Sequence, residues 1–256
     1  LMGGTLPLLG RFVIDAPSRI GPRIAQLYFL NTAGAVLGCA AAGFWLIEGF
    51  GLAGSLWIAC AINLIVGAIT FALGYEGQHA TEPQVPPPNI DALIDARTRR
   101  VVIVCIGITG GLTMAYELVW IRMVGFIFGS SSQSFSVMLV TFLGGIALGG
   151  LLAHRILTRW PRGLVAAFGI CEAGIAISVL CALPLYERFP YVFAQARTLF
   201  APTDGGYAAF MVVQVFLLGA VMLVPTTLIG VTLPLAARIA IRSMDEVGSG
   251  VGDAWA

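Results

Sequence analysis

The chain has 256 residues, of which 58% are hydrophobic and only 11% are charged, with a mean hydropathy of +0.92 and a net charge of +1. A soluble domain carries about 25% charged residues and has too little interior for this much apolar side chain. The composition therefore excludes a disordered chain, a nucleic-acid binder and an ordinary cytosolic enzyme. It predicts an all-α polytopic membrane protein whose main partner is the lipid bilayer.

Six segments are apolar enough to cross a bilayer as helices, because a helical span needs about 20 such residues. In chain order they are 24–47, 52–74, 101–121, 134–154, 164–185 and 207–230. Residues 1–10 look like the end of a further, partial span. Pro225 and Pro234 lie in the last segment and its extension, so we expect a kink or helix break there.

The basic residues indicate how these spans are oriented. All 14 are Arg, and alternate crossing places 11 of them on the side that holds residues 11–23. Because basic residues accumulate in cytoplasmic loops, we expect 11–23, 75–99, 154–163 and 238–252 to be cytoplasmic. The setting that fits is a bacterial cytoplasmic (inner) membrane.

Two connections stand out between the spans. Residues 75–99 are polar and rich in Pro, which predicts an extended cytoplasmic linker between two helical parts, 1–74 and 100–256. The connection 186–206 lies on the opposite side and carries an apolar stripe that predicts an amphipathic helix at 187–203 in the outer interface. An ordered loop packed on the bundle is the alternative. The stripe consists of Phe189, Val192, Phe193, Ala196, Leu199 and Phe200.

The beginning of the sequence is similar to its end. Residues 1–29 align without gaps to 228–256 at an offset of 227, with nine of 29 positions identical, including G-x-T-L-P-L followed by Arg. An even number of spans separates the two copies, so both point the same way through the membrane. Such a parallel repeat is typical of the two halves of major facilitator transporters. On this interpretation further helices of the same protein complete the bundle, and the chain is a piece of a longer protein.

Five segments in this order resemble the membrane region of spermidine synthase-like integral membrane proteins. They are Leu27–Gly38, Glu117–Arg122, Gly129–Ser132, Phe142–Gly149 and Pro225–Pro234. The resemblance implies a facilitator-like helical bundle that is often fused to a cytoplasmic aminopropyltransferase domain. Gly149–Arg155 also looks like the short basic loop after the second span of a facilitator half, without the usual acidic residue.

The chain itself lacks the residue sets that catalysis requires. We find no paired carboxylates, no Ser/His/Asp set and no metal-ligand spacing, and we expect no catalytic, cofactor-binding or metal-binding residues. Gly248–Asp253 is the only stretch similar to a nucleotide-binding loop, and no strand precedes it. Aminopropyltransferase activity would need a domain outside this chain.

Polar residues inside the spans are the candidate functional residues, since ionisable groups at bilayer depth are costly. Glu172 is the deepest, and it is interpreted either as a proton or cation site or as a hydrogen-bonded packing residue. Glu117, with Arg122 beyond it, is interpreted as a polar anchor at the outer mouth, as a pair to another helix or as a substrate ligand. Uncharged candidates, which either bridge helices or line a cavity, are Asn31, Asn63, Gln214, Thr226 and Thr227.

Three functions remain open from the sequence. The first is a membrane domain that anchors or serves a fused or associated cytoplasmic synthase domain. The second is a facilitator-type transporter of a polyamine or another small organic cation. The third is a non-catalytic structural subunit of a larger membrane complex.

Overall fold

The structure is a computed structural model that describes residues 20–76, 94–128, 132–160, 163–200 and 203–240. The described part of the chain is helical throughout, apart from a few connecting residues. Its elements are α2 (Ile20–Ala41), the π-helical segment η3 (Ala42–Leu46), α3 (Ile47–Glu76), α4 (Ala96–Phe128), α5 (Ser132–Arg159), α6 (Leu164–Thr198) and α7 (Asp204–Ala240). The all-α prediction is confirmed for these residues.

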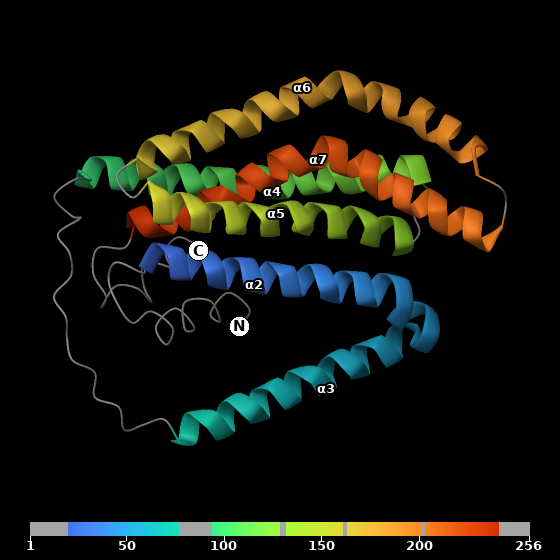
Figure 1. Ribbon diagram of the computed structural model, residues 1–256, viewed down its shortest axis with the longest axis horizontal. Coiled ribbons are helices and arrows are strands. Elements are labelled where there is room, and N and C mark those ends of the chain that lie inside the picture. The colour runs from blue at the N-terminus through green and yellow to red at the C-terminus, as the bar shows by residue number, and fades with distance from the viewer. Residues whose placement is uncertain (1–19, 77–93, 129–131, 161–162, 201–202, 241–256) are drawn as a thin grey trace.

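Five helical stretches of the described chain are long and apolar enough to cross a membrane. Four of them correspond to α4, α5, α6 and α7. The fifth, Gly21–Ala72, has 52 residues and runs through α2, η3 and most of α3. It is interrupted at Gly51, whose φ of 69° lies in the left-handed region that favours glycine. Figure 1 shows that the chain reverses near this point, so that α3 runs back toward the end where α2 begins.

The helices alternate in direction. In Figure 1, α2, α4 and α6 begin at the same end of the bundle at which α3, α5 and α7 finish. Seven of the ten Arg residues in the described segments lie at this end, whereas Arg122, Arg188 and Arg197 belong to the other. The protein is therefore a multi-pass helical membrane protein in which basic residues gather at one end.

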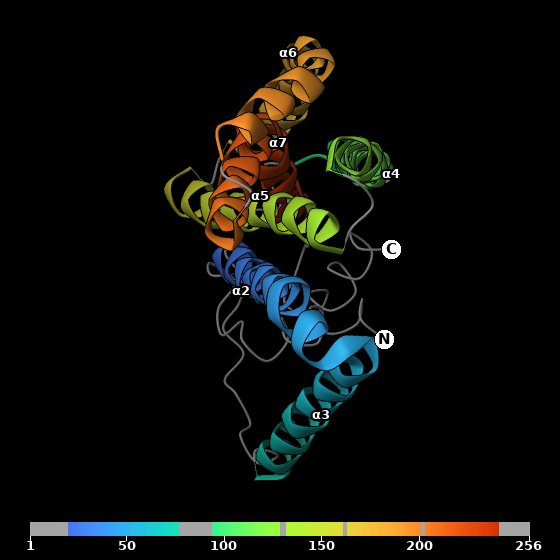
Figure 2. The same ribbon diagram turned by 90° about the vertical axis from the view of Figure 1, so that its right-hand side faces the viewer.

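The centre of the bundle is a close crossing of α5 with α7, and α2 lies against the other side of α5 (Figure 2). A Cβ atom added at Gly149 would lie 2.2 Å from the carbonyl oxygen of Thr227 and 2.6 Å from the Cα atom of Gly230. A Cβ atom at Gly145 would overlap the side chain of Thr226 in the same way. Only glycine allows two helix backbones to approach this closely, as in other small-residue contacts between membrane helices.

The glycine pairs at GxxxG spacing in the sequence separate into two classes. Gly145 and Gly149 form the contact just described, and Gly150 is packed against Tyr28 and Phe29 of α2. In contrast, nothing lies within 4 Å of a Cβ atom added at Gly34 or Gly38 on α2, or at Gly107 or Gly111 on α4. Spacing alone does not distinguish these classes, because it does not say which helix face meets a neighbour.

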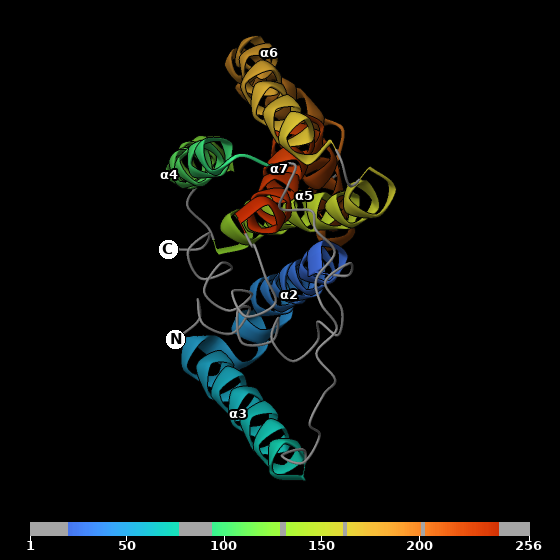
Figure 3. The ribbon, with the colours of Figure 1, turned by 90° about the vertical axis from the view of Figure 1, so that its left-hand side faces the viewer.

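Helix α3 diverges from the rest of the molecule (Figure 3). Every side chain from Ala59 to Ala72 is exposed, although the segment is almost entirely apolar. Near the corner with η3, a hydrogen bond from Gln133 to Glu48 connects α5 to the first turn of α3. An apolar helix with so little contact within the bundle fits contact with lipid.

Several local predictions differ from the structure. Residues 187–198 continue α6 as one helix rather than forming a separate element, because a helix can pass through Pro184 and Pro190 with a bend (Figure 1). Its apolar stripe is divided, with Phe189 and Phe193 buried in the bundle and Leu199 exposed. The predicted loop at Gly149–Arg155 is instead an internal part of α5.

The sequence predicts a kink or helix break at Pro225 and Pro234; a break is absent, since α7 continues through both residues to Ala240. Each proline lacks one backbone N–H group, but tight packing on α5 keeps the remaining turns helical. The linker 75–99 lies largely outside the described residues. The repeat cannot be compared within them, because the described residues 20–29 align to 247–256 and the described residues 228–240 align to 1–13, which both lie outside the described ranges.

Two side chains fasten the helix ends at the Arg-rich end. The Nε atom of Arg99, on α4, donates to the carbonyl oxygen of Ile239 on α7 at 3.0 Å, and the Arg99 side chain is buried. His154, on α5, places Nδ1 2.9 Å from the carbonyl oxygen of Pro22 on α2. A carbonyl oxygen only accepts, so the contact requires the proton on Nδ1.

We expect Arg99→Ala to destabilise the bundle by about 1.5–3 kcal/mol, because it removes a hydrogen bond from a charged donor and the packing of its stem. The matched control is Arg100→Ala, which removes an exposed neighbour of the same type. Unfolding of both variants in mixed detergent micelles measures the difference. Equal stability of the two variants would show that the Arg99 contact contributes nothing.

Candidate functional site

Glu172 lies between α6 and α4, in the first third of α6. It is the ninth residue of α6, which places it about 12 Å along the axis from the first residue. The hydroxyl oxygen of Thr109 on α4 lies 2.8 Å from Oε1 and 2.9 Å from Oε2 of this carboxyl group. Glu172 is half-buried and Thr109 is buried. One hydroxyl group therefore serves both oxygens of the carboxyl group.

Thr109 belongs to a polar stripe along α4. Its hydroxyl oxygen also lies 2.9 Å from the carbonyl oxygen of Cys105, and the Thr113 hydroxyl group donates to the carbonyl oxygen of Thr109 at 2.7 Å. Glu117 is the next residue at a spacing of four and therefore shares this face of the helix. Sequence reasoning missed Thr109 and Thr113. The signal that reveals them is the spacing of four that leads from Cys105 to Glu117.

The surroundings of Glu172 are apolar. Its neighbour Cys171 is buried in a cluster with Phe168 of α6 and Val231 of α7. No Arg or His of the described segments forms an ion pair with Glu172; its only side-chain partner there is Thr109. A carboxyl group with one hydroxyl partner and no basic neighbour can bind a proton or attract a cation.

Glu117 and Arg122 do not form a pair within the described chain. Glu117 is half-buried and Arg122 is exposed, and the five-residue separation places them on different faces of α4. Glu117 and Arg122 are therefore separate residues in the second half of α4. Asn31 on α2 and Asn63 on α3 are both exposed, so neither bridges two of the described helices.

The two threonines of α7 are part of the helix crossing. Thr226 is fully buried against Gly145, and its hydroxyl group donates to the carbonyl oxygen of Met222 at 2.7 Å. Thr227 is half-buried and contributes its carbonyl oxygen to the contact with Gly149. Both residues thus lie at the contact between α5 and α7.

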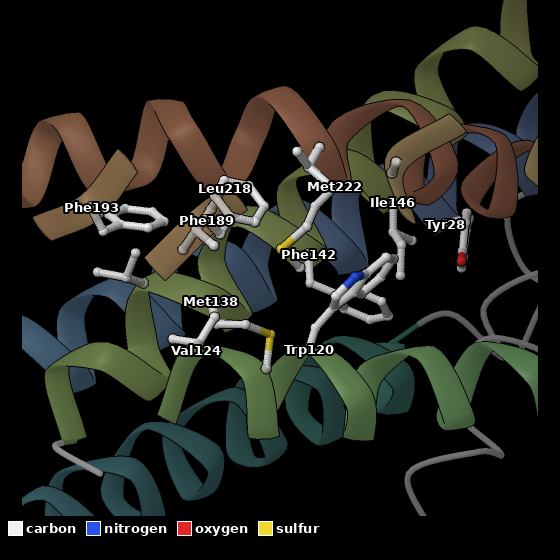
Figure 4. Close-up of a cluster of buried hydrophobic side chains, with 13 residues drawn as sticks. Tyr28, Trp120, Val124, Met138, Phe142, Ile146, Phe189, Phe193, Leu218 and Met222 are labelled. Carbon is white, nitrogen blue, oxygen red and sulfur yellow. The ribbon is translucent and has the colours of Figure 1, made fainter. Parts of the chain in front are cut away.

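Gln214 is the most isolated polar residue. Only 3% of it is exposed, and its Oε1 atom has no hydrogen-bond partner. It lies on α7 one turn before Leu218, which is part of the main apolar cluster (Figure 4). A buried amide oxygen that has no donor among the described residues is costly.

Trp120 is a core residue rather than a member of the interfacial aromatic belt. It is 2% exposed, and its Nε1 atom donates to the hydroxyl oxygen of Tyr186 at 2.8 Å. Its ring centroid lies 5.9 Å from that of Tyr116 and 5.9 Å from that of Phe142. Figure 4 shows Trp120 and Phe142 side by side in the cluster. The indole therefore joins α4, α5 and α6.

A groove of about 280 Å³ lies between α6 and α7. Pro225 forms part of its wall, although α7 is not broken there. The remaining lining is mostly small and apolar, namely Ser178, Cys181, Ala182, Leu185, Ala220, Val221 and Val224. Neither Glu172 nor Thr109 is among the residues that line this groove.

All five cysteines are free thiols, and the described residues contain no cluster of His, Cys, Asp or Glu that could hold a metal ion. The features that can carry function are therefore the carboxyl group of Glu172 and the helix crossing. Comparison of the chain with protein-family models, with curated proteins and with solved structures gave no match.

Proposed function

We propose that this chain is the membrane-embedded domain of a spermidine synthase-like protein, anchoring or serving a cytoplasmic aminopropyltransferase domain. The observation that carries the proposal is where the motifs lie in the fold. Phe142–Gly149 on α5 meets Pro225–Pro234 on α7 at the glycine crossing, and Leu27–Gly38 on α2 contributes Tyr28 and Phe29 to the contact with Gly150. Three of the segments behind the resemblance thus form one packed unit.

The proposed topology has six spans. The stretch Gly21–Ala72 would be about 78 Å long as one straight helix, far more than the roughly 30 Å of the hydrocarbon core. Its reversal at Gly51 supports two spans, α2 and α3, which with the remaining four make six. The facilitator-like arrangement and the parallel repeat belong to the same proposal.

The Arg-rich end of the bundle supports the anchoring role. Arg99 and His154 tie α4 to α7 and α5 to α2 at this end, where excess basic residues favour the cytoplasm. A helical bundle whose helices are connected by hydrogen bonds at the cytoplasmic end would hold an attached domain in a fixed position relative to the membrane.

The test is an activity measurement on the intact protein purified from membranes. We expect transfer of a labelled aminopropyl group to a diamine acceptor, at a rate unchanged by Glu172→Gln, because catalysis resides in the cytoplasmic domain. Gly149→Ala should lower the amount of folded protein in the membrane without changing the specific activity of what remains. An intact protein that binds no diamine and transfers no aminopropyl group would overturn the synthase proposal.

A second candidate is transport of a polyamine or another small cation, and Glu172 is the observation that favours it. We expect proteoliposomes with the intact protein to take up labelled diamine and Glu172→Gln to reduce the rate at least about tenfold, because a lost charge contact costs 1.4 kcal/mol or more. Glu187→Gln is the matched control, since it removes an exposed carboxylate from the same helix. Equal uptake by the wild type and Glu172→Gln would remove Glu172 from the mechanism.

A further inference from the structure

The Thr109 hydroxyl group has more neighbouring acceptor oxygens than protons to donate. Three oxygen atoms lie within 2.9 Å of its hydroxyl oxygen, the two of Glu172 and the carbonyl oxygen of Cys105. A hydroxyl group has a single proton to donate. With an ionised Glu172, all three neighbours are acceptors, and at most one of them receives that proton.

A protonated Glu172 resolves the problem. The carboxylic acid then donates to the Thr109 oxygen, and the Thr109 hydroxyl group donates to the carbonyl oxygen of Cys105, so each donor has an acceptor. When the proton leaves, the Thr109 hydroxyl group turns and donates to the carboxylate instead. The same two residues therefore bond α4 to α6 in both states, with the donor reversed.

The electrostatic surroundings also favour a bound proton. The residue beside Glu172 on α6 is the buried Cys171, and Cys105 lies one turn before Thr109 on α4. The charged residues of α7, which packs against both helices, are Asp204 and Arg238 near its two ends. Without a basic partner, burial of a carboxylate at bilayer depth is unfavourable because nothing offsets the loss of hydration of the charge. Burial of the neutral acid carries a much smaller free-energy cost.

We propose that Glu172 and Thr109 form a proton-exchange site between α4 and α6. The ligand of the site is a proton, which the carboxyl group exchanges with the aqueous phase as the Thr109 hydroxyl group reverses. This rests on the transport candidate given above and deepens it, because it names the proton as the cation that binds at Glu172. A diamine would need a second acid, and Glu117 lies two turns further along α4.

The test uses dicyclohexylcarbodiimide, an apolar reagent that modifies protonated carboxyl groups in membranes, on the intact protein in liposomes. Mass spectrometry of the peptides reports the adduct at each Glu. We expect labelling of Glu172 at neutral pH, with a rate that falls about tenfold per pH unit once the group is ionised. Glu172→Gln should abolish this adduct, and Glu117→Gln should leave it unchanged.

Thr109 variants separate the proton site from simple packing. Thr109→Ser keeps the hydroxyl group and should retain the pH profile of labelling. Thr109→Val has nearly the same shape but removes the donor to the ionised form, so labelling should persist to more alkaline pH. Identical profiles for Ser and Val would overturn the role of Thr109.

Failure of this inference is distinguishable from failure of the transport candidate. Absence of a Glu172 adduct at neutral pH, in protein that still takes up diamine, would overturn the proton site alone. A pH-dependent adduct in protein without uptake would support the proton site and overturn diamine transport.

Discussion

Gly149→Ala is expected to destabilise the protein by about 1–3 kcal/mol, although alanine is the better helix former by about 1 kcal/mol. The added methyl group would lie 2.2 Å from the carbonyl oxygen of Thr227 and 2.6 Å from the Cα atom of Gly230. Both are backbone atoms of α7, which cannot turn aside as a flexible side chain can. Relief requires the two helices to separate along their crossing, with loss of the contacts that surround it. Unfolding in mixed detergent micelles measures the effect.

Gly144→Ala is the matched control, because Gly144 belongs to the same helix and has no atom within 4 Å of an added Cβ. It should be neutral or stabilise the protein by up to about 1 kcal/mol. A destabilised Gly144→Ala variant, or a Gly149→Ala variant as stable as the wild type, would contradict the crossing of α5 and α7.

Trp120→Ala is expected to cost about 3–5 kcal/mol, the range for removal of a buried aromatic side chain. The substitution leaves a cavity between the rings of Tyr116 and Phe142 and deprives the Tyr186 hydroxyl group of its donor. Because Trp120 contacts three helices, α4 and α6 should loosen together, and unfolding should become less cooperative. The same micelle titration, followed by tryptophan fluorescence, detects both effects.

Two variants separate the contributions of Trp120. Trp120→Phe keeps an aromatic ring and loses the indole N–H group, so a cost of about 1 kcal/mol is expected from the hydrogen bond alone. Trp57→Ala removes an indole that is 77% exposed on α3 and should change stability by less than about 0.5 kcal/mol. A Trp120→Ala variant no less stable than Trp57→Ala would contradict the buried position of Trp120 in the core.

The helical class and the position of most spans follow from composition and span length. The position of the turn between α2 and α3 also follows from the sequence, since the predicted spans 24–47 and 52–74 meet beside Gly51. Local rules failed where packing decides the outcome. Proline predicts a kink or break in α7, but the helix continues through both prolines where it packs on α5. An aromatic residue near the end of a span suggests a position at the membrane interface, but Trp120 is buried with neighbours from two other helices.

The site was predicted in part. Burial cost singles out Glu172 from a list of 13 acidic residues, because its depth is visible in the sequence. Its partner is not visible, since Thr109 lies 63 positions away on another helix. The sequence identifies Thr226 and Thr227 as polar residues of a span, but their place at the glycine crossing depends on the facing helix.

The cytoplasmic location of the Arg-rich end and the position of Glu172 within the bilayer both depend on the six-span topology. It can be tested in a cysteine-free background by introducing Ser18→Cys before α2, His79→Cys after α3 and Thr203→Cys before α7. Labelling with a membrane-impermeant maleimide, in right-side-out and inside-out vesicles, reports the side of each thiol. The six-span topology predicts that positions 18 and 79 react only in inside-out vesicles and position 203 only in right-side-out vesicles. Reaction of positions 18 and 79 from opposite sides of the membrane would contradict it.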